Sequence, residues 1–247
     1  AGWIGISTEM AMMISFAIVA VWWIAATIPL LKTYKQKHYI TRQSKAIQDS
    51  FKRLGITLKN VRNEKKIFLF LLAFFFYIDG VYTIIDMATA YGTALGLDST
   101  GLLLALLVTQ LVAFPFAILF GRLSNRYDTE KMILICIAAY FGIAVFAMFL
   151  KEQWQFWFLA ILVGMFQGGI QALSRSYFTK IIPAEKTGEY FGLMDICGKG
   201  ASFLGTIVIS LVSQFTGQVN IGVGAISLFF ILGMIVFKMS AAETGSM

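Results

Sequence analysis

The stretch IFLFLLAFFFYIDGVYTIIDMATAYGTA, residues 67–94, is long and apolar enough to cross a bilayer, yet it contains Asp79 and Asp86. A carboxylate at the centre of a spanning helix costs about 2.5–3.5 kcal/mol on insertion scales. Such residues therefore face the interior of a helix bundle or a water-filled cavity, and not the lipid. The stretch predicts a membrane helix with one polar, functional face.

The composition of the whole chain is that of a membrane protein. Of its 247 residues, 58% are hydrophobic and 13% are charged, whereas soluble domains carry about 25% charged residues. The net charge of +7 does not indicate a nucleic-acid partner, because the basic residues lie between apolar runs. Cys136 and Cys197 lie within apolar runs and His38, the single histidine, lies in a basic connection, so the sequence predicts no metal site and no cofactor.

Seven apolar runs of about 20 residues predict seven membrane-spanning helices. They lie at residues 10–31, 67–94, 101–120, 132–150, 154–174, 190–213 and 219–237. The connections 32–66, 121–131 and 175–189, together with Lys238, hold all Lys and Arg residues except Lys151 and Lys199. The positive-inside rule predicts that these connections and the C-terminus are cytoplasmic.

The long connection between the first two spans has the pattern of a basic amphipathic helix. Its apolar residues recur at helical spacing, at Ile47, Phe51, Leu54, Leu58 and Val61, and basic residues fill other positions, at Lys45, Lys52, Arg53, Lys59 and Arg62. Such a helix can lie on the anionic inner leaflet with its apolar stripe in the headgroup boundary. A solvated charged linker is the alternative interpretation.

One helix, a long basic connection and six further helices match a cut through a twelve-helix transporter built from two six-helix halves. We expect residues 1–31 to be the last helix of the N-terminal half, 32–66 the central cytoplasmic loop, and 67–247 the C-terminal six-helix bundle. The start AGWIGISTEM has no basic n-region and is expected to be an interior cut. The expected partners are the lipid bilayer and the missing N-terminal six-helix half.

The connection GRLSNRYDTEK, residues 121–131, resembles the loop signature of the major facilitator superfamily. Gly121, Leu123, Ser124, Asn125, Arg126 and Lys131 match that signature, and residues 128–130 depart from it. A glycine lets helix ends approach closely, and Arg126 can meet a helix end or a carboxylate in a contact that breaks as the halves rock. The alternative is an ordinary short basic loop.

Three further stretches resemble the vacuolar-effluxer branch of that superfamily, the family of the autophagy-related vacuolar amino-acid exporter and its bacterial relatives. They are FKRLGITLKN (51–60), LLAFFFYIDGVYTII (71–85) and GGIQALSRSYFTKIIPAEKTGEYFG (168–192). The resemblance runs from about residue 16 to 238. It implies the major facilitator fold and export of a small solute, with amino acids as candidates, across a bacterial inner or plasma membrane. For most bacterial members it implies no defined substrate.

The span at 154–174 carries polar residues on one face. Gln167, Gln171 and Arg175 share this face, and the resemblance implies that the helix lines the central cavity. Gln167 and Gln171 are therefore candidate solute contacts, with interhelical hydrogen bonding as an equal alternative. Arg175 is expected to be an anchor at the cytoplasmic end.

The remaining candidates are charged residues within spans. Asp79, Tyr82 and Asp86 share a face, with Asp79 expected near the midplane and Asp86 near the external mouth. Asp195 and Lys199 can pair at i, i+4, or Lys199 can pair with Asp79 at the same depth. Three interpretations of Asp79 remain open: a proton site, a switchable pair with Lys199, or a fixed structural pair.

These features favour a transporter that moves a small polar solute by alternating access, with proton coupling left open. The second hypothesis is a seven-helix receptor or retinal-type protein, which has the same number of spans. The lysine in the sixth span instead of the last, and the long basic first connection, argue against it. An enzyme is the least favoured, because the chain has no HExxH or GxSxG motif and no nucleophile paired with a base.

Overall fold

The computed structural model describes residues 7–35 and 46–243, and the chain divides into one unit up to Ala46 and a second from Ile47 onward. The first unit contains helix α1, Thr8–Thr33. The second contains α2 (Ala46–Asn63), α3 (Lys65–Ala94), α4 (Ser99–Leu123), α5 (Thr129–Ala147), α6 (Gln153–Ile181), the 3₁₀ turn η1 (Ala184–Lys186), α7 (Thr187–Gly200), α8 (Phe203–Thr216), α9 (Val219–Ala225) and α10 (Ser227–Ala242).

Seven helical segments among the described residues are long and apolar enough to span a membrane. They are Glu9–Thr33, Lys65–Ala94, Ser99–Leu123, Thr129–Ala147, Gln153–Ile181, Ala184–Thr216 and Val219–Ala242. Each contains or closely overlaps one predicted span, so the all-helical membrane fold with seven spans is confirmed.

The predicted span at 190–213 lies within the spanning segment Ala184–Thr216, and the structure divides this segment into two helices. Helix α7 ends at Gly200, α8 begins at Phe203, and Ser202 between them has a left-handed φ of 75°. Ser202 is the one non-glycine residue with positive φ in the part of the chain that the structure describes. The last span is also divided, but its junction at Ile226 keeps right-handed helical dihedrals of −60° and −25°, so α9 and α10 are only bent relative to each other.

Polar residues at the connections fix where several helices begin. The side chain of Asp98 accepts a hydrogen bond from the Gly101 N–H at 2.7 Å at the start of α4. Asp128 accepts one from the Glu130 N–H at 3.0 Å at the start of α5. These side chains satisfy donors that have no partner within the helix, and they therefore stabilise the starts of α4 and α5.

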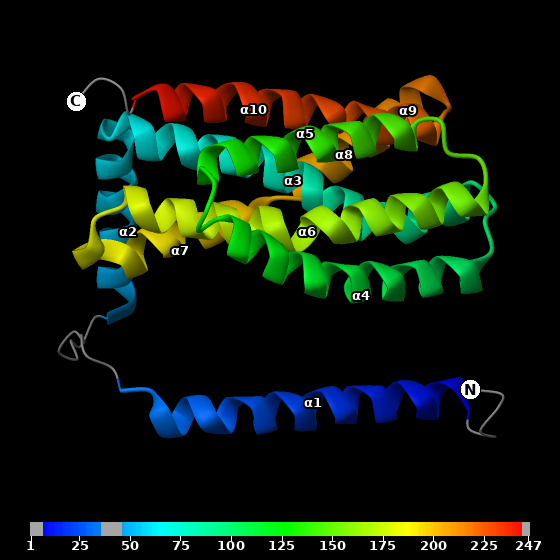
Figure 1. The fold of residues 1–247 in the computed structure, drawn as a ribbon, viewed down its shortest axis with the longest axis horizontal. Helices are drawn as coiled ribbons and strands as arrows, with labels where there is room; N and C mark the ends of the chain where they lie inside the picture. The colour runs from blue at the N-terminus through cyan, green and yellow to red at the C-terminus, as the bar shows by residue number, and fades with distance from the viewer. Residues whose placement is uncertain (1–6, 36–45, 244–247) are drawn as a thin grey trace. The chain divides into compact units, whose positions relative to one another are not determined.

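Helix α3 lies at the centre of the second unit, packed along α10 (Figure 1). Its residues Phe70, Tyr77 and Ile78 are fully buried. Small residues allow the two backbones to approach: a methyl group at Gly80 would lie 2.6 Å from the Phe230 ring, and one at Gly233 would lie 2.9 Å from Cβ of Tyr77. Close packing of this kind is a main source of helix association in lipid.

Helices α4 and α6 form the second closely packed pair. A methyl group at Gly164 would lie 2.6 Å from the Thr109 carbonyl oxygen, and one at Gly168 would lie 2.8 Å from Cβ of Ala117. The small residues in the predicted span at 154–174 therefore do permit close helix contact. The helix itself continues to Ile181, beyond the predicted end.

Helix α2 crosses the end of the bundle that carries the basic connections (the basic end), at a steep angle to the spanning helices (Figure 1). Thr57 and Val61 are buried, and Thr57 Oγ1 donates a hydrogen bond to Glu189 Oε2 of α7 at 2.7 Å. Leu58, which belongs to the predicted apolar stripe, is 58% exposed. The helix therefore turns the Thr57–Val61 face to the bundle and leaves Leu58 outside it.

Several residues of that prediction lie outside what the structure describes. His38 and Lys45 fall between residues 35 and 46, and for Ile47, Phe51, Lys52 and Arg53 the structure describes the backbone helix but not the side chains.

Candidate functional site

A polar cavity of about 280 Å³ opens where α3, α6 and α7 meet the break before α8. We call it the charged pocket, and it is lined by Phe74, Tyr82, Arg175, Met194, Asp195, Gly198, Lys199, Ala201 and Ser202. Three of these residues carry charge. The glycine and alanine at the end of α7 leave the space that the longer side chains surround.

An ion pair joins two of the helices that form this pocket. Arg175 of α6 donates from Nη2 to Oδ1 of Asp195 on α7 at 2.9 Å. The two side chains are 54% and 46% exposed. Exposed ion pairs of this kind contribute about 0.2–1 kcal/mol, so exchanging one partner for a charged solute costs little.

Lys199 lines the same pocket and forms no ion pair with any described residue. The predicted pairings of Lys199 with Asp195 or with Asp79 are thus absent from this structure. Asp195 instead forms an ion pair with Arg175, and Asp79 accepts hydrogen bonds from backbone N–H groups. The pocket therefore presents two cationic side chains and one carboxylate.

Asp79 lies behind the break and does not line the charged pocket. It is fully buried, at 0% exposure. Its Oδ1 accepts a hydrogen bond from the Ser202 N–H, its Oδ2 accepts one from the Gly205 N–H at 3.1 Å, and Thr83 Oγ1 approaches Oδ1 at 3.5 Å. Asp79 thereby caps the N-terminus of α8 from the neighbouring helix α3, an arrangement that the sequence did not indicate.

The other two residues of the predicted polar face of α3 lie in different surroundings. Tyr82 lines the charged pocket and is half-buried. Asp86, one turn further along, is exposed and lines neither of the two cavities described here. The predicted stripe therefore divides into a buried cap, a pocket wall and an exposed carboxylate.

On α6, the arginine and not the glutamines reaches the pocket. Gln167 and Gln171 are half-buried and line neither cavity, and Oε1 of Gln167 is buried without a hydrogen-bond partner among the described residues. The prediction of Arg175 as an anchor at the cytoplasmic end stays a prediction; α6 continues six residues beyond it to Ile181, about 9 Å along the axis.

The loop motif is placed at the basic end, away from the charged pocket. Gly121 lies in the last turn of α4, where a methyl group would meet nothing within 4 Å among the described residues. Asn125 and Arg126 are exposed, and Arg126 forms no ion pair within the described part of the chain. The contacts made by the matching residues are local: Ser124 Oγ donates to the Gly121 carbonyl at 2.8 Å, and Leu123 packs against the buried core.

Residues that the sequence did not single out connect the helices at this end. Tyr177 of α6 donates its hydroxyl to Glu130 Oε1 of α5 at 2.8 Å, and Lys180 Nζ donates to Thr129 Oγ1 at 3.1 Å. Glu130 is one of the residues at which the loop departs from the superfamily signature. The acid that replaces a usual basic residue could have indicated a local partner.

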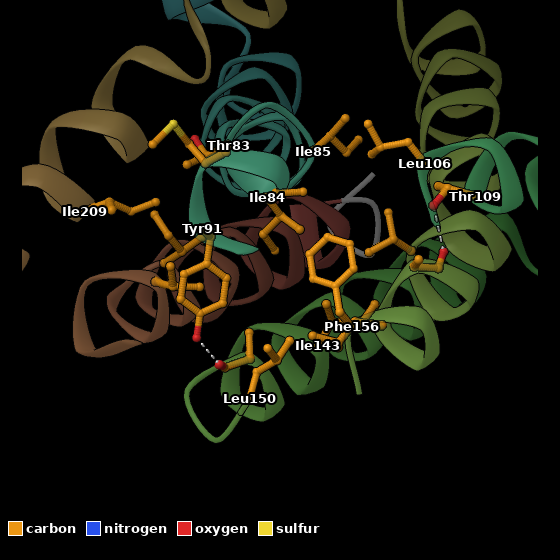
Figure 2. A pocket seen from close by; sticks show the side chains of 18 of the residues that line it. Thr83, Ile84, Ile85, Tyr91, Leu106, Thr109, Ile143, Leu150, Phe156 and Ile209 are labelled. Atoms are coloured by element: carbon orange, nitrogen blue, oxygen red, sulfur yellow. Dashed lines mark hydrogen bonds between the residues drawn. The ribbon is translucent and has the colours of Figure 1, made fainter. Parts of the chain in front are cut away.

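A second cavity of about 80 Å³ lies between α3, α4, α5, α6, α8 and α9 (Figure 2). We call it the apolar pocket, because aliphatic side chains form most of its wall. Figure 2 shows its tyrosine and threonine hydroxyls turned to neighbouring backbone: Tyr91 donates to the Ala147 carbonyl at 2.6 Å, and Thr109 donates to the Ala160 carbonyl at 3.1 Å. The other polar lining residues are Thr83, whose hydroxyl approaches Asp79 at 3.5 Å, and Gln110, so the apolar pocket offers a polar solute few groups to bind.

Comparison with known proteins agrees with this architecture. The family model described as "Vacuole effluxer Atg22 like" matches residues 4–247. The chain is 44% identical over 243 residues to the "Uncharacterized MFS-type transporter YxiO" of Bacillus subtilis, covering 98% of this chain and 57% of the relative. It is 24% identical over 254 residues to "Autophagy-related protein 22" of Kluyveromyces lactis, covering 94% of this chain and 52% of the relative. The chain thus spans about half the length of these curated relatives.

Proposed function

This chain belongs to the Atg22-like vacuole effluxer family of MFS-type transporters, and from that premise we propose that it moves a small polar solute by alternating access. In this proposal the seven described spans act together with five further helices, which complete an N-terminal six-helix half. Residues 1–31 are the last helix of that half, 32–66 the central loop, and 67–247 the second bundle. The basic end faces the cytoplasm of a bacterial cell.

The observation that carries the proposal is the charged pocket beside a broken helix. Arg175, Asp195 and Lys199 gather there from two helices, around a cavity large enough for a small molecule. Discontinuous spanning helices commonly form the solute sites of secondary transporters. Charged residues within spans that face a cavity indicate a solute or ion pathway.

The signs of the charges indicate the class of solute. A carboxylate can approach Lys199 or displace Asp195 from Arg175, and an ammonium group can then approach the freed Asp195. Tyr82 also lines the pocket and adds a neutral phenol to its wall. The three charged side chains carry a net charge of +1, so the pocket favours a solute with a carboxylate. An amino acid supplies this carboxylate, together with an ammonium group that can approach Asp195.

The break between α7 and α8 supplies a way for the pocket to change shape. Helix α7 carries Asp195 and Lys199, and it is joined to α8 only through Ala201 and Ser202. Because the Arg175–Asp195 pair is half-exposed, it can open at a cost of about 0.2–1 kcal/mol. In this way Arg175 and Asp195 couple solute binding to the movement of α7 against α6.

The receptor hypothesis has no independent support, since the family match covers nearly the whole chain. Proton coupling is part of the proposal only for Asp195, the one carboxylate that lines the charged pocket.

The test is transport by the complete two-half protein that contains this chain, reconstituted in proteoliposomes. Counterflow is measured with tritiated leucine, glutamate and arginine, which cover neutral, acidic and basic amino acids. We expect Arg175→Gln and Asp195→Asn each to lower counterflow at least tenfold. Lys238→Gln, which removes a charge near the end of α10, serves as the matched control and keeps the rate. Full counterflow in both pocket variants would refute the site.

A further inference from the structure

The backbone at the break adopts a conformation that needs outside support. Helix α7 still closes with the Ala201 N–H donating to the Cys197 carbonyl at 3.0 Å. The next residue, Ser202, then takes a left-handed φ of 75° before α8 begins. This region is disfavoured for every residue with a Cβ except where surrounding contacts hold it. The Ser202 side chain does not cap α8.

Asp79 provides the missing support from the adjacent helix. The first N–H groups of a helix have no partner within it, and two of them in this region, on Ser202 and Gly205, donate to the buried Asp79 carboxylate. A negative charge at a helix N-terminus is also favoured by the helix dipole. The carboxylate therefore both fixes the left-handed turn and satisfies the first turn of α8.

The two halves of the broken span differ in how closely they are held to α3. A methyl group at Gly205 of α8 would overlap Thr83 Oγ1 of α3, so no space separates the two helices there. A methyl group at Gly198 of α7 would meet Phe74 at 3.6 Å, an ordinary contact distance. At these two positions, α8 touches α3 without a gap, whereas α7 leaves space for one methyl group beside α3.

We infer that Asp79 is a positioning residue that anchors α8 to α3, so that α7, which carries Asp195 and Lys199, is the half that moves during transport. The inference deepens the proposed function. It rests on that function, because a movement of α7 during transport requires that the protein is a transporter. Asp79 contacts no solute and carries no proton in the cycle. It fixes the end of the hinge about which the charged side chains of α7 are displaced.

The first experiment measures the anchor without any solute. Amide hydrogen exchange is followed in the complete protein in nanodiscs. We expect Asp79→Asn to accelerate exchange at residues 202–206 at least tenfold, because the amide group retains one acceptor oxygen where the carboxylate had two. Asp86→Asn, the same change on the same helix, leaves exchange in this segment unchanged. Equal exchange in the Asp79→Asn variant and the unmodified protein would overturn the anchor, whatever the outcome for the proposed function.

The second experiment separates positioning from solute contact and from proton transfer. We expect Asp79→Asn to lower the maximal counterflow rate about tenfold and to change the dissociation constant for the solute less than threefold. The shape of the pH profile stays the same. Adding Ser202→Gly restores part of the rate, because glycine adopts the left-handed turn without help. If Asp79 contacted the solute, Asp79→Asn would raise the dissociation constant. If Asp79 carried a proton in the cycle, the variant would flatten the pH profile. In neither case would adding Ser202→Gly restore the rate.

A variant that leaves the carboxylate intact keeps the inference testable should Asp79→Asn not fold. Gly205→Ala forces α8 away from Thr83, and we expect it to show the same combination of reduced rate and retained affinity. Full transport by Gly205→Ala would overturn the anchor.

Discussion

Two cavities of the bundle are linked through the buried carboxylate of Asp79, and they differ in volume and polarity. The charged pocket measures about 280 Å³ and contains an ion pair and a lysine. The apolar pocket measures about 80 Å³, and its hydroxyl groups are occupied. Thr83 lines the apolar pocket and contacts Asp79, and Asp79 in turn holds Ser202, which lines the charged pocket.

The difference between the two cavities indicates which of them can bind a polar solute. Moving a polar group from water to apolar surroundings without a hydrogen bond costs about 2–7 kcal/mol. The charged pocket replaces water with ionic partners, and the apolar pocket does not. A polar solute is therefore held only in the charged pocket, and the apolar pocket contributes packing between helices.

The largest effect is expected from inverting the charges of the ion pair. Arg175→Asp places two carboxylates at the position of the present 2.9 Å contact, where like charges repel. We expect at least a hundredfold loss of affinity for a zwitterionic solute, measured by scintillation proximity with the complete protein. The double variant Arg175→Asp/Asp195→Arg restores the pair in reverse and recovers at least tenfold of that loss. If the double variant binds no better than the single one, the two residues do not act as a pair in binding.

The sequence predicted the spans and several residues of the charged pocket better than it predicted the contacts that these residues make. Hydropathy located all seven spans, because the length of an apolar run depends only on the thickness of the bilayer. It also located Tyr82, Asp195 and Lys199, because charged or polar residues in a span face the bundle interior or a water-filled cavity and not the lipid. The resemblance in residues 71–85 and 168–192 predicted the family, which the family model confirms.

The contacts within the site were not predictable in the same way. The partners of Asp79 are backbone N–H groups, which every residue has and which leave no signal in the sequence. Lys199 was therefore the only partner of Asp79 that the sequence could suggest. Gly198 and Gly200 on either side of it were a usable signal for the break, since two glycines weaken a helix by about 1 kcal/mol each relative to alanine.

A smaller effect is expected from the hydroxyl groups beside the apolar pocket. Tyr91→Phe leaves the buried Ala147 carbonyl without the donor that now lies at 2.6 Å. Interhelical hydrogen bonds in membranes contribute about 0.6 kcal/mol on average and up to about 1.7 kcal/mol. We expect a loss of stability in this range, seen as a lower unfolding midpoint in detergent, with solute affinity unchanged. A loss of affinity comparable to that of Arg175→Gln would show that the apolar pocket also binds the solute.

The smallest effect is expected from filling the apolar pocket. Val223 of α9 is nearly buried and lines the cavity, so Val223→Ile adds one methylene group to space that is now empty. A buried methylene contributes about 0.8 kcal/mol, and for a chain of this size about 1 kcal/mol raises the melting temperature by roughly 2–4 °C. We expect a rise of that size in a thermal unfolding experiment, with no change in the transport rate. Leu228→Ile, an exposed apolar exchange on α10 outside both cavities, is the control. A fall in the transport rate with Val223→Ile would mean that the apolar pocket must change volume during the cycle, and the contrast between a binding cavity and a packing cavity would no longer hold.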